Sequence, residues 1–223
     1  MKKIYALLPM IAAFAMTGCG DNEKGTNLEF TQEQAKEKVR QLAQTDGYEI
    51  SLKYTSSDSE GSDLEELTIG QKEGFTWTVS GDSRTLWKEE ETQFTIYNYD
   101  SEQLKFVVVH TYTKEELASL GITEFYSLDL YGTFLYMGNY YDGLEGYHKV
   151  KDLTFAGRSA TQYKLKETYA SAYVEAKVII DKETGLTLYW GWEGRDLEGE
   201  SGSAAYEVTS FKTGSEVSVP AHD

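Results

Sequence analysis

The main pattern along this chain is an alternation of apolar and polar residues with a period of two. Four segments show it most clearly: Tyr48-Ile50-Leu52-Tyr54, Phe75-Trp77-Val79, Phe94-Ile96 and Leu186-Leu188-Trp190-Trp192. Because successive side chains of a strand point to opposite faces, this alternation predicts strands with one apolar face and one polar, solvent-exposed face.

Short turn signals separate the segments, at residues 57–63, 81–82, 100–103, 182–185 and 198–202. Consecutive strands joined by turns this short must be antiparallel, because a parallel connection needs a crossover of about a dozen residues or more. We therefore expect an antiparallel meander of about eight to eleven strands.

Two stretches change the period to about 3.6 and predict helices. Thr31 and Gln34 form a capping-box pattern before an apolar face, which predicts an amphipathic helix over residues 31–44. Thr113 and Glu116 repeat the pattern before a helical insert expected over about residues 113–140. The insert carries its apolar residues at helix-like spacings: Leu117, Leu120, Phe125, Leu128, Phe134 and Leu135.

An antiparallel sheet of this size can bury its apolar residues in two ways. A closed or two-layer β body buries them against itself, whereas a strongly curved single sheet needs helices on its concave side. The helix before the strands and the insert between them favour the second arrangement. We expect one mainly β (α+β) domain over residues 29–223, a half-barrel with helices on the concave side.

The amino terminus has the pattern of an export signal. Lysines at positions 2 and 3 precede an apolar run over residues 4–16, and small residues follow at 17–18. The run is shorter than the about 20 residues that cross a bilayer, and Pro9 interrupts it. We expect residues 1–18 to be a signal peptide that is removed.

Cys19, the only cysteine in the chain, follows this leader directly. Its surroundings resemble the lipobox of bacterial lipoproteins, although Met16 replaces the usual leucine. The resemblance implies that Cys19 receives a diacylglycerol thioether, with palmitate-type chains, and anchors the protein extracytoplasmically to a cell membrane or an outer membrane. The alternative is ordinary secretion, which leaves an unfavourable free thiol in an oxidising compartment. Residues 19–28 are then the lipidated cysteine and a flexible spacer.

Charge and cysteine content narrow the class of protein further. Loss of the leader removes two of the 21 basic residues, leaving 19 against 37 acidic residues and a net charge of −18. This balance opposes nucleic acid and anionic lipid surfaces, and we expect no nucleic-acid partner. A single cysteine forms no intrachain disulfide, so stability must come from an apolar core.

Catalytic and metal-binding patterns are weak. Residues 81–83 (Gly-Asp-Ser) resemble the start of a GDS-type esterase motif, but such enzymes also need a later Asp-x-x-His. His110, His148 and His222 each lack an aspartate three positions earlier, so an ordinary hairpin turn is the stronger interpretation. Acidic clusters around 58–63 and 196–200 are more typical of solvated loops than of calcium sites. We expect no enzyme activity, no cofactor and no metal.

Residues 155–165, 178–186 and 206–211 resemble the carboxy-terminal half of proteins related to the lipoprotein carrier LolA. In that family a strand ending in Asp is followed by a Lys-x-x-Gly turn, as in Asp181-Lys182-Glu183-Thr184-Gly185, and a proline comes near the end, as in Val219-Pro220. The same turn residues also suit any tight hairpin. The resemblance covers about residues 150–220 and implies an unclosed half-barrel whose apolar hollow accepts acyl chains or acylated ligands such as lipoproteins.

Two functions of different classes follow from these observations. The resemblance, which extends to membrane-anchored relatives of the LolB kind, implies a tethered lipid carrier, acceptor or envelope sensor. The alternative is a tethered adhesion or protein-interaction module with no small-molecule ligand. The candidate cavity residues, each of which could instead fill the core, are Tyr48, Ile50, Leu52, Tyr54, Phe75, Trp77, Val79, Phe94, Ile96, Phe125, Leu128, Phe134, Leu135, Leu188, Trp190 and Trp192.

Overall fold

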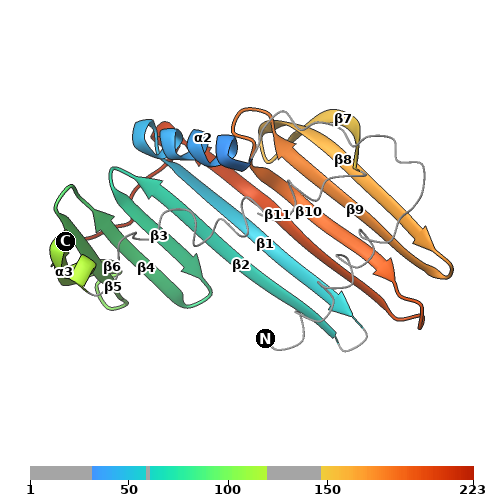
Figure 1. Cartoon of the computed structure of the whole chain (residues 1–223). Helices are drawn as coiled ribbons and strands as arrows, with labels where there is room; N and C mark the ends of the chain where they lie inside the picture. Colours follow the sequence, from blue (N-terminus) through green and yellow to red (C-terminus); the bar gives the residue numbers. More distant parts are fainter. Residues whose placement is uncertain (1–31, 59–60, 120–146) are drawn as a thin grey trace.

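The computed structural model describes residues 32–58, 61–119 and 147–223. Eleven strands form one antiparallel sheet in the order β6-β5-β4-β3-β2-β1-β11-β10-β9-β8-β7, and its two edges remain unjoined (Figure 1). The expected mainly β fold is confirmed, at the upper end of the predicted strand number.

The elements are α2 (Gln32–Thr45), β1 (Tyr48–Asp58), β2 (Gly61–Lys72), β3 (Phe75–Ser80), β4 (Ser83–Glu89), β5 (Gln93–Asp100), β6 (Lys105–Thr113), α3 (Lys114–Ser119), β7 (His148–Phe155), β8 (Arg158–Tyr169), β9 (Ala172–Asp181), β10 (Thr187–Arg195), β11 (Ser201–Thr213) and a 3-10 turn, Gly214–Glu216.

The first and last strands of the chain are neighbours at the centre of the sheet. β1 pairs with β11 from Tyr48 opposite Thr213 to Ser57 opposite Ser203, and its other side pairs with β2. The sheet is therefore two meanders, β1 to β6 and β7 to β11, joined by this one pair. The sequence predicted the meanders but not the joining pair, because no turn signal marks a pairing between distant segments.

The predicted turns are hairpin loops of the sheet. Gly81 and Asp82 connect β3 to β4, with Ser80 opposite Ser83. Gly81 has a φ of 56°, a left-handed conformation that glycine adopts without strain. The esterase-like triplet is therefore a hairpin turn, as the simpler interpretation predicted. Between β1 and β2 the pairing continues to Asp58 opposite Gly61.

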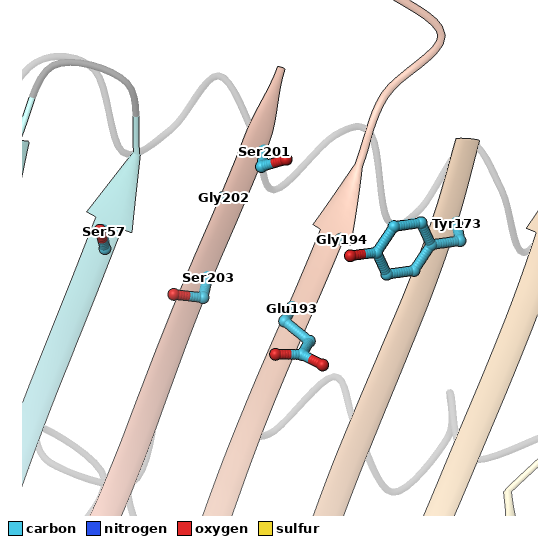
Figure 2. A pocket seen from close by; sticks show the side chains of 7 residues that line it. All are labelled: Ser57, Tyr173, Glu193, Gly194, Ser201, Gly202 and Ser203. Carbon is cyan, nitrogen blue, oxygen red and sulfur yellow. The ribbon is translucent and has the colours of Figure 1, made fainter. Parts of the chain in front are cut away.

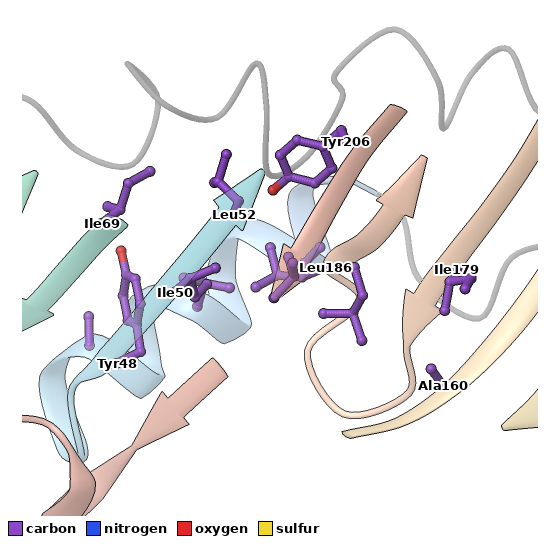
Figure 3. Packing of buried hydrophobic residues seen from close by; sticks show 13 residues of the cluster. Tyr48, Ile50, Leu52, Ile69, Ala160, Ile179, Leu186 and Tyr206 are labelled. Atoms are coloured by element: carbon purple, nitrogen blue, oxygen red, sulfur yellow. The ribbon is translucent and has the colours of Figure 1, made fainter. Parts of the chain in front are cut away.

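The helix α2 packs on one face of the central strands, which we call the inner face. Its buried residues Ala35, Val39 and Ala43 recur every four positions, as the amphipathic pattern predicted. The helix ends where Leu42 accepts backbone hydrogen bonds from Asp46 and Gly47. The cluster that α2 completes, shown in Figure 3, contains Tyr48, Ile50, Leu52, Ile69, Leu186, Leu188, Tyr206 and Val208. It also includes Ala160 and Ile179, which the β8–β9 register places on the opposite face of those two strands.

The opposite, outer face carries a separate apolar cluster on β3 to β6. Directly opposed residues of an antiparallel pair share a face. Trp77 opposes Gly70, whereas the adjacent Ile69 belongs to the inner cluster, so Trp77 lies on the outer face. Its ring covers Gly70 so closely that a Cβ on Gly70 would lie 2.0 Å from it. The outer cluster is Phe75, Trp77, Leu86, Tyr97, Phe106 and Val217.

The carboxy-terminal segment, residues 217–223, covers this outer cluster. Val217 is 2% exposed, and its carbonyl accepts a hydrogen bond from Lys72 Nζ at 2.8 Å. Farther along, the Phe106 N–H donates to the Ala221 carbonyl at 2.8 Å, and the Asp223 N–H donates to the Phe106 carbonyl at 3.1 Å. The chain thus ends by pairing with the start of the edge strand β6.

The second helix lies at the β6 edge, away from α2 (Figure 1). Its predicted capping box is present: the Glu116 N–H donates to Thr113 Oγ1 at 3.1 Å, and the Thr113 N–H donates to Glu116 Oε2 at 2.7 Å. The bond from that N–H lowers the pKa of Glu116. Leu117 is buried, as expected, and the predicted insert beyond Ser119 lies outside the described residues.

The closing role of the carboxy-terminal segment makes a prediction about stability. Val217→Ala should lower the free energy of unfolding by about 1 to 2 kcal/mol, because it leaves a cavity over the Trp77 cluster. Urea denaturation measures this change. Ser218→Ala, an exposed neighbour, should change stability by less than about 0.5 kcal/mol. Equal effects of the two variants would show that the segment does not seal the outer cluster.

Candidate functional site

The structure divides the candidate cavity residues between the two faces of the sheet. Phe75, Trp77 and Val79 oppose Lys72, Gly70 and Thr68, which places them on the outer face. The remaining described candidates lie on the inner face: Tyr48, Ile50, Leu52 and Tyr54 on β1, Phe94 and Ile96 on β5, and Leu188, Trp190 and Trp192 on β10. Phe125, Leu128, Phe134 and Leu135 lie outside the described residues. The twelve described candidates therefore lie on two faces and do not all converge on one site.

A row of large side chains crosses the inner face. Tyr206 opposes Tyr54 on one side and Trp190 on the other. The row continues from Trp190 to Val178 and from Val178 to Tyr163. We call these five residues the inner row. At about 4.8 Å between strands, the row extends about 19 Å across β1, β11, β10, β9 and β8.

The inner row joins two apolar clusters. Tyr206 belongs to the cluster that α2 completes. Trp190, Val178 and Tyr163 belong to a second cluster, which consists of strand side chains and Tyr147. Among the described residues, α2 therefore contributes to the first cluster only. The second half of the inner face is apolar and rich in rings, and its residues are buried: Tyr163 is 5%, Val178 2% and Trp190 5% exposed.

The hydroxyl of Tyr206 is a polar group of the inner row that is completely buried, as the indole nitrogen of Trp190 also is. Tyr206 is 1% exposed, and its hydroxyl has no hydrogen-bond partner in the described part of the chain (Figure 3). Burial raises the pKa of Tyr206, so the hydroxyl stays protonated and can donate. A buried hydroxyl without a partner costs about 1 to 3 kcal/mol. A carbonyl or carboxylate oxygen brought to this point would remove that cost.

Sequence reasoning did not include Tyr206 among the candidates. The signal was present, because Ala204, Tyr206 and Val208 alternate in the last strand as inward-facing residues do. Its position beside Tyr54 follows only from the β1–β11 register.

The residues that carried the family resemblance build the β9–β10 turn. Asp181 is fully buried, and its Oδ2 accepts a 2.9 Å ion-pair contact from Arg158 Nη2. The same oxygen accepts hydrogen bonds from the Thr184 hydroxyl at 2.5 Å and the Thr184 N–H at 3.2 Å. Gly185 has a φ of 76° and donates its N–H to the Asp181 carbonyl. In this chain, the motif therefore holds a hairpin in shape.

A shallow depression of about 230 Å³ lies on the outer face near the far ends of the central strands (Figure 2). Its lining is mostly polar: Ser57, Tyr173, Glu193, Gly194, Ser201, Gly202 and Ser203. Residues an odd number of positions apart on one strand point to opposite faces. Ser57, Ser203 and Glu193 each lie three positions from an inner-face residue of their own strand, so they lie on the outer face. None of the candidate cavity residues lines it.

The described residues contain no group of three or more His, Cys, Asp or Glu side chains placed to hold a metal ion. Over the same ranges, neither helix has the length and apolar character needed to cross a bilayer. Cys19 and the leader lie outside the described residues.

Comparison with known proteins gives distant matches. No family model matches the chain, and no curated protein does. Among solved structures, it resembles an outer membrane lipoprotein-sorting protein domain from Vibrio parahaemolyticus at 10% identity and a TM-score of 0.24, over 84% of this chain and 95% of that one. A DUF1329 family protein from Desulfovibrio piger matches at 10% identity and 0.26, over 84% and 93%. A structure of PNGF-II matches at 12% and 0.25, over 78% and 28%. Scores this low carry no information about ligand or activity.

The turn geometry predicts unequal roles for the two acids around Arg158. Asp181→Ala should lower the free energy of unfolding by about 3 kcal/mol, since it removes the buried half of an ion pair. Glu183→Ala removes a partner of the same arginine that is 75% exposed, and should cost less than about 1 kcal/mol. Chemical denaturation of both variants compares them. A larger loss from Glu183→Ala would contradict the assignment of Asp181 as the residue that fixes the turn.

Two tyrosines of the inner face should respond oppositely to loss of the hydroxyl. Tyr206→Phe should raise the free energy of unfolding by about 1 kcal/mol, because it removes a buried donor without a partner. Tyr48→Phe should lower it by about 1 kcal/mol, because the Tyr48 hydroxyl bonds to Gln71 Oε1 at 3.3 Å. Urea unfolding in the absence of added lipid measures both. A destabilised Tyr206→Phe variant would mean that the hydroxyl has a partner such as a buried water.

Proposed function

We propose that this protein is an extracytoplasmic lipoprotein, tethered to a bacterial membrane by a lipid on Cys19, that binds an acyl chain on the inner face of its sheet. The chain belongs either to a lipid or to an acylated ligand, and the role is that of an acceptor, carrier or envelope sensor. The observation that carries the proposal is the inner row, with its buried and unpartnered Tyr206 hydroxyl.

The chemistry of the row suits an acyl chain. Aromatic rings provide wide apolar surface that loses little rotamer freedom on binding. Each methylene buried against such a surface contributes about 0.8 kcal/mol. The Tyr206 hydroxyl would then donate to the ester or carboxyl oxygen at the polar end of the chain. A tether on Cys19 makes the protein a fixed acceptor rather than a free shuttle.

We also propose that the protein acts by binding and not by catalysis. The inner row contains four phenols or indoles but no carboxylate, imidazole or thiol that could act as a base or a nucleophile. The aliphatic and aromatic side chains of the inner row support binding of an apolar ligand.

Native mass spectrometry of the unlipidated mature chain, purified from a bacterial host, tests the proposal. We expect co-purified lipid, and displacement of a fluorescent fatty acid by unlabelled fatty acid. Trp190→Phe, on the inner row, should weaken binding of the fluorescent fatty acid by about 3-fold or more, because apolar indole surface is lost. Trp77→Phe is the matched control, since Trp77 lies on the outer face. It should leave probe affinity unchanged.

Absence of both bound lipid and probe binding would reject the acyl-binding function. That result would favour the alternative function, a tethered protein-interaction module. Its surface would be the β6 edge, where Val108 is 50% exposed and Val109 is 53% exposed.

The anchor makes a separate prediction. Cys19→Ala should move the protein from the membrane fraction to the soluble extracytoplasmic fraction, because the thiol is the atom that would carry the lipid. Fractionation followed by immunoblotting measures the distribution. Unchanged retention in the membrane after a high-salt wash would refute lipidation at this residue.

A further inference from the structure

Basic side chains gather in one part of a strongly acidic protein. Residues 148–182, which form β7 to β9 and their turns, contain seven lysines or arginines against four acidic residues, a net charge of +3. The whole chain has a net charge of −16. This edge of the sheet is therefore net positive in a protein that is acidic as a whole.

The strand register places three of these lysines together with His148 on the outer face. His148 opposes Lys164, and Lys164 opposes Lys177. Lys151 opposes Gln162, which lies two positions from Lys164 and shares its face. Val178, the neighbour of Lys177, belongs to the inner row, so these four side chains point away from it. We call His148, Lys151, Lys164 and Lys177 the outer basic cluster.

The lysines of the outer basic cluster lack the ion pairs that several other cations of the described chain have. Lys88, Lys114 and Lys212 pair with glutamates at 2.6 to 3.0 Å, and Lys166 pairs with Glu175. By contrast, Lys151, Lys164 and Lys177 make no ion pair within the described part of the chain. These three lysines lie on adjacent strands of a protein in which acids outnumber bases 37 to 21.

Holding these charges together has a cost within the protein. Like charges directly opposite each other on adjacent strands are destabilising. Burial lowers the pKa of Lys177, Glu207 acts in the opposite direction, and repulsion from Lys164 lowers it further. Lys177 Nζ is stabilised in part by the ring of Tyr189, 3.8 Å away. Glu175 and Glu207 offset only part of this repulsion, because residues 148–182 keep a net charge of +3, and an external anion would stabilise the cluster further.

We propose that the outer basic cluster docks on the anionic phospholipid headgroups of the membrane that holds the Cys19 anchor. The spacer before α2 limits the choice of surface. Residues 20–31 span at most about 42 Å when fully extended, so the domain stays close to that membrane. Each lysine near an anionic bilayer contributes about 1 kcal/mol, over a distance of about one Debye length.

The contact would orient the domain. The acidic remainder of the protein is repelled by the same surface that attracts β7 to β9, so the β7 edge turns toward the membrane. Tyr163, on β8, is the end of the inner row nearest that edge. The orientation thus brings the Tyr163 end of the row nearer to the bilayer than its Tyr54 end, with the row on the face turned away from the headgroups.

Vesicle binding by the mature chain with Cys19→Ala, which has no lipid anchor, tests the inference. We expect the protein to sediment with vesicles of equal parts phosphatidylglycerol and phosphatidylcholine at low ionic strength, and not with phosphatidylcholine alone. Raising the salt concentration should release it, because screening weakens the attraction. The double variant Lys151→Gln/Lys164→Gln should lower the partition coefficient by about 30-fold, as expected for two lysines.

A control with the same change in net charge separates the cluster from charge in general. Lys38→Gln/Lys114→Gln removes two exposed lysines on α2 and α3 and should change the partition coefficient by less than about 3-fold. Equal losses from both double variants would overturn the inference, as would binding to phosphatidylcholine alone or no binding to the anionic vesicles. Acyl-chain binding by the inner row is measured separately with the fatty-acid probe, so either function can fail without the other.

Discussion

The pairing of β1 with β11 is the interaction on which the rest of the structure depends. It joins two meanders that have no other strand pairing in common, and it places the first strand of the sheet beside the last. An ion pair between Glu49 and Lys212 at 2.6 Å and a bond from the Thr209 hydroxyl to the Ser51 carbonyl at 3.2 Å lie along it. Because these strands are distant in sequence, closing the sheet is costly in chain entropy and slow to form. The inner row exists only once this pair has formed.

Each meander is buried by a different segment, on a different face. α2 lies on the inner face over the centre of the sheet, where small side chains such as Ala35 and Ala43 allow close approach. Residues 217–223 lie on the outer face over β3 to β6, where Trp77 lies flat on Gly70. A single sheet with apolar residues on both faces needs a separate segment packed on each face to bury them. This division leaves the inner face of β8 to β10 as the apolar surface that neither segment completes among the described residues.

The sequence predicted local features well and spatial relations poorly, for a physical reason. Alternation, capping boxes and turn residues act over a few positions, so the strands, the start of α3 and the end of α2 were visible in advance. Which face a strand presents depends on its register with its neighbour. Phe75-Trp77-Val79 alternates just as Tyr48-Ile50-Leu52 does, yet the β2 register turns it to the outer face. Tyr206 was missed because its importance comes from Tyr54 and Trp190, its neighbours across two strand pairs.

The charged residues show the same difference between what composition predicts and what their positions in the fold determine. A net charge of −18 after loss of the leader argues against contact with an anionic membrane. The fold collects Lys151, Lys164 and Lys177 at one edge, where Glu175 and Glu207 on the same face offset only part of their charge, so one edge of an acidic protein carries a net positive charge. A protein held by a lipid does not need strong electrostatic binding, since the tether already supplies the affinity. A few kcal/mol from one cluster, opposed by repulsion everywhere else, is enough to select one orientation. In a tethered acceptor, orientation decides which strand meets the membrane first.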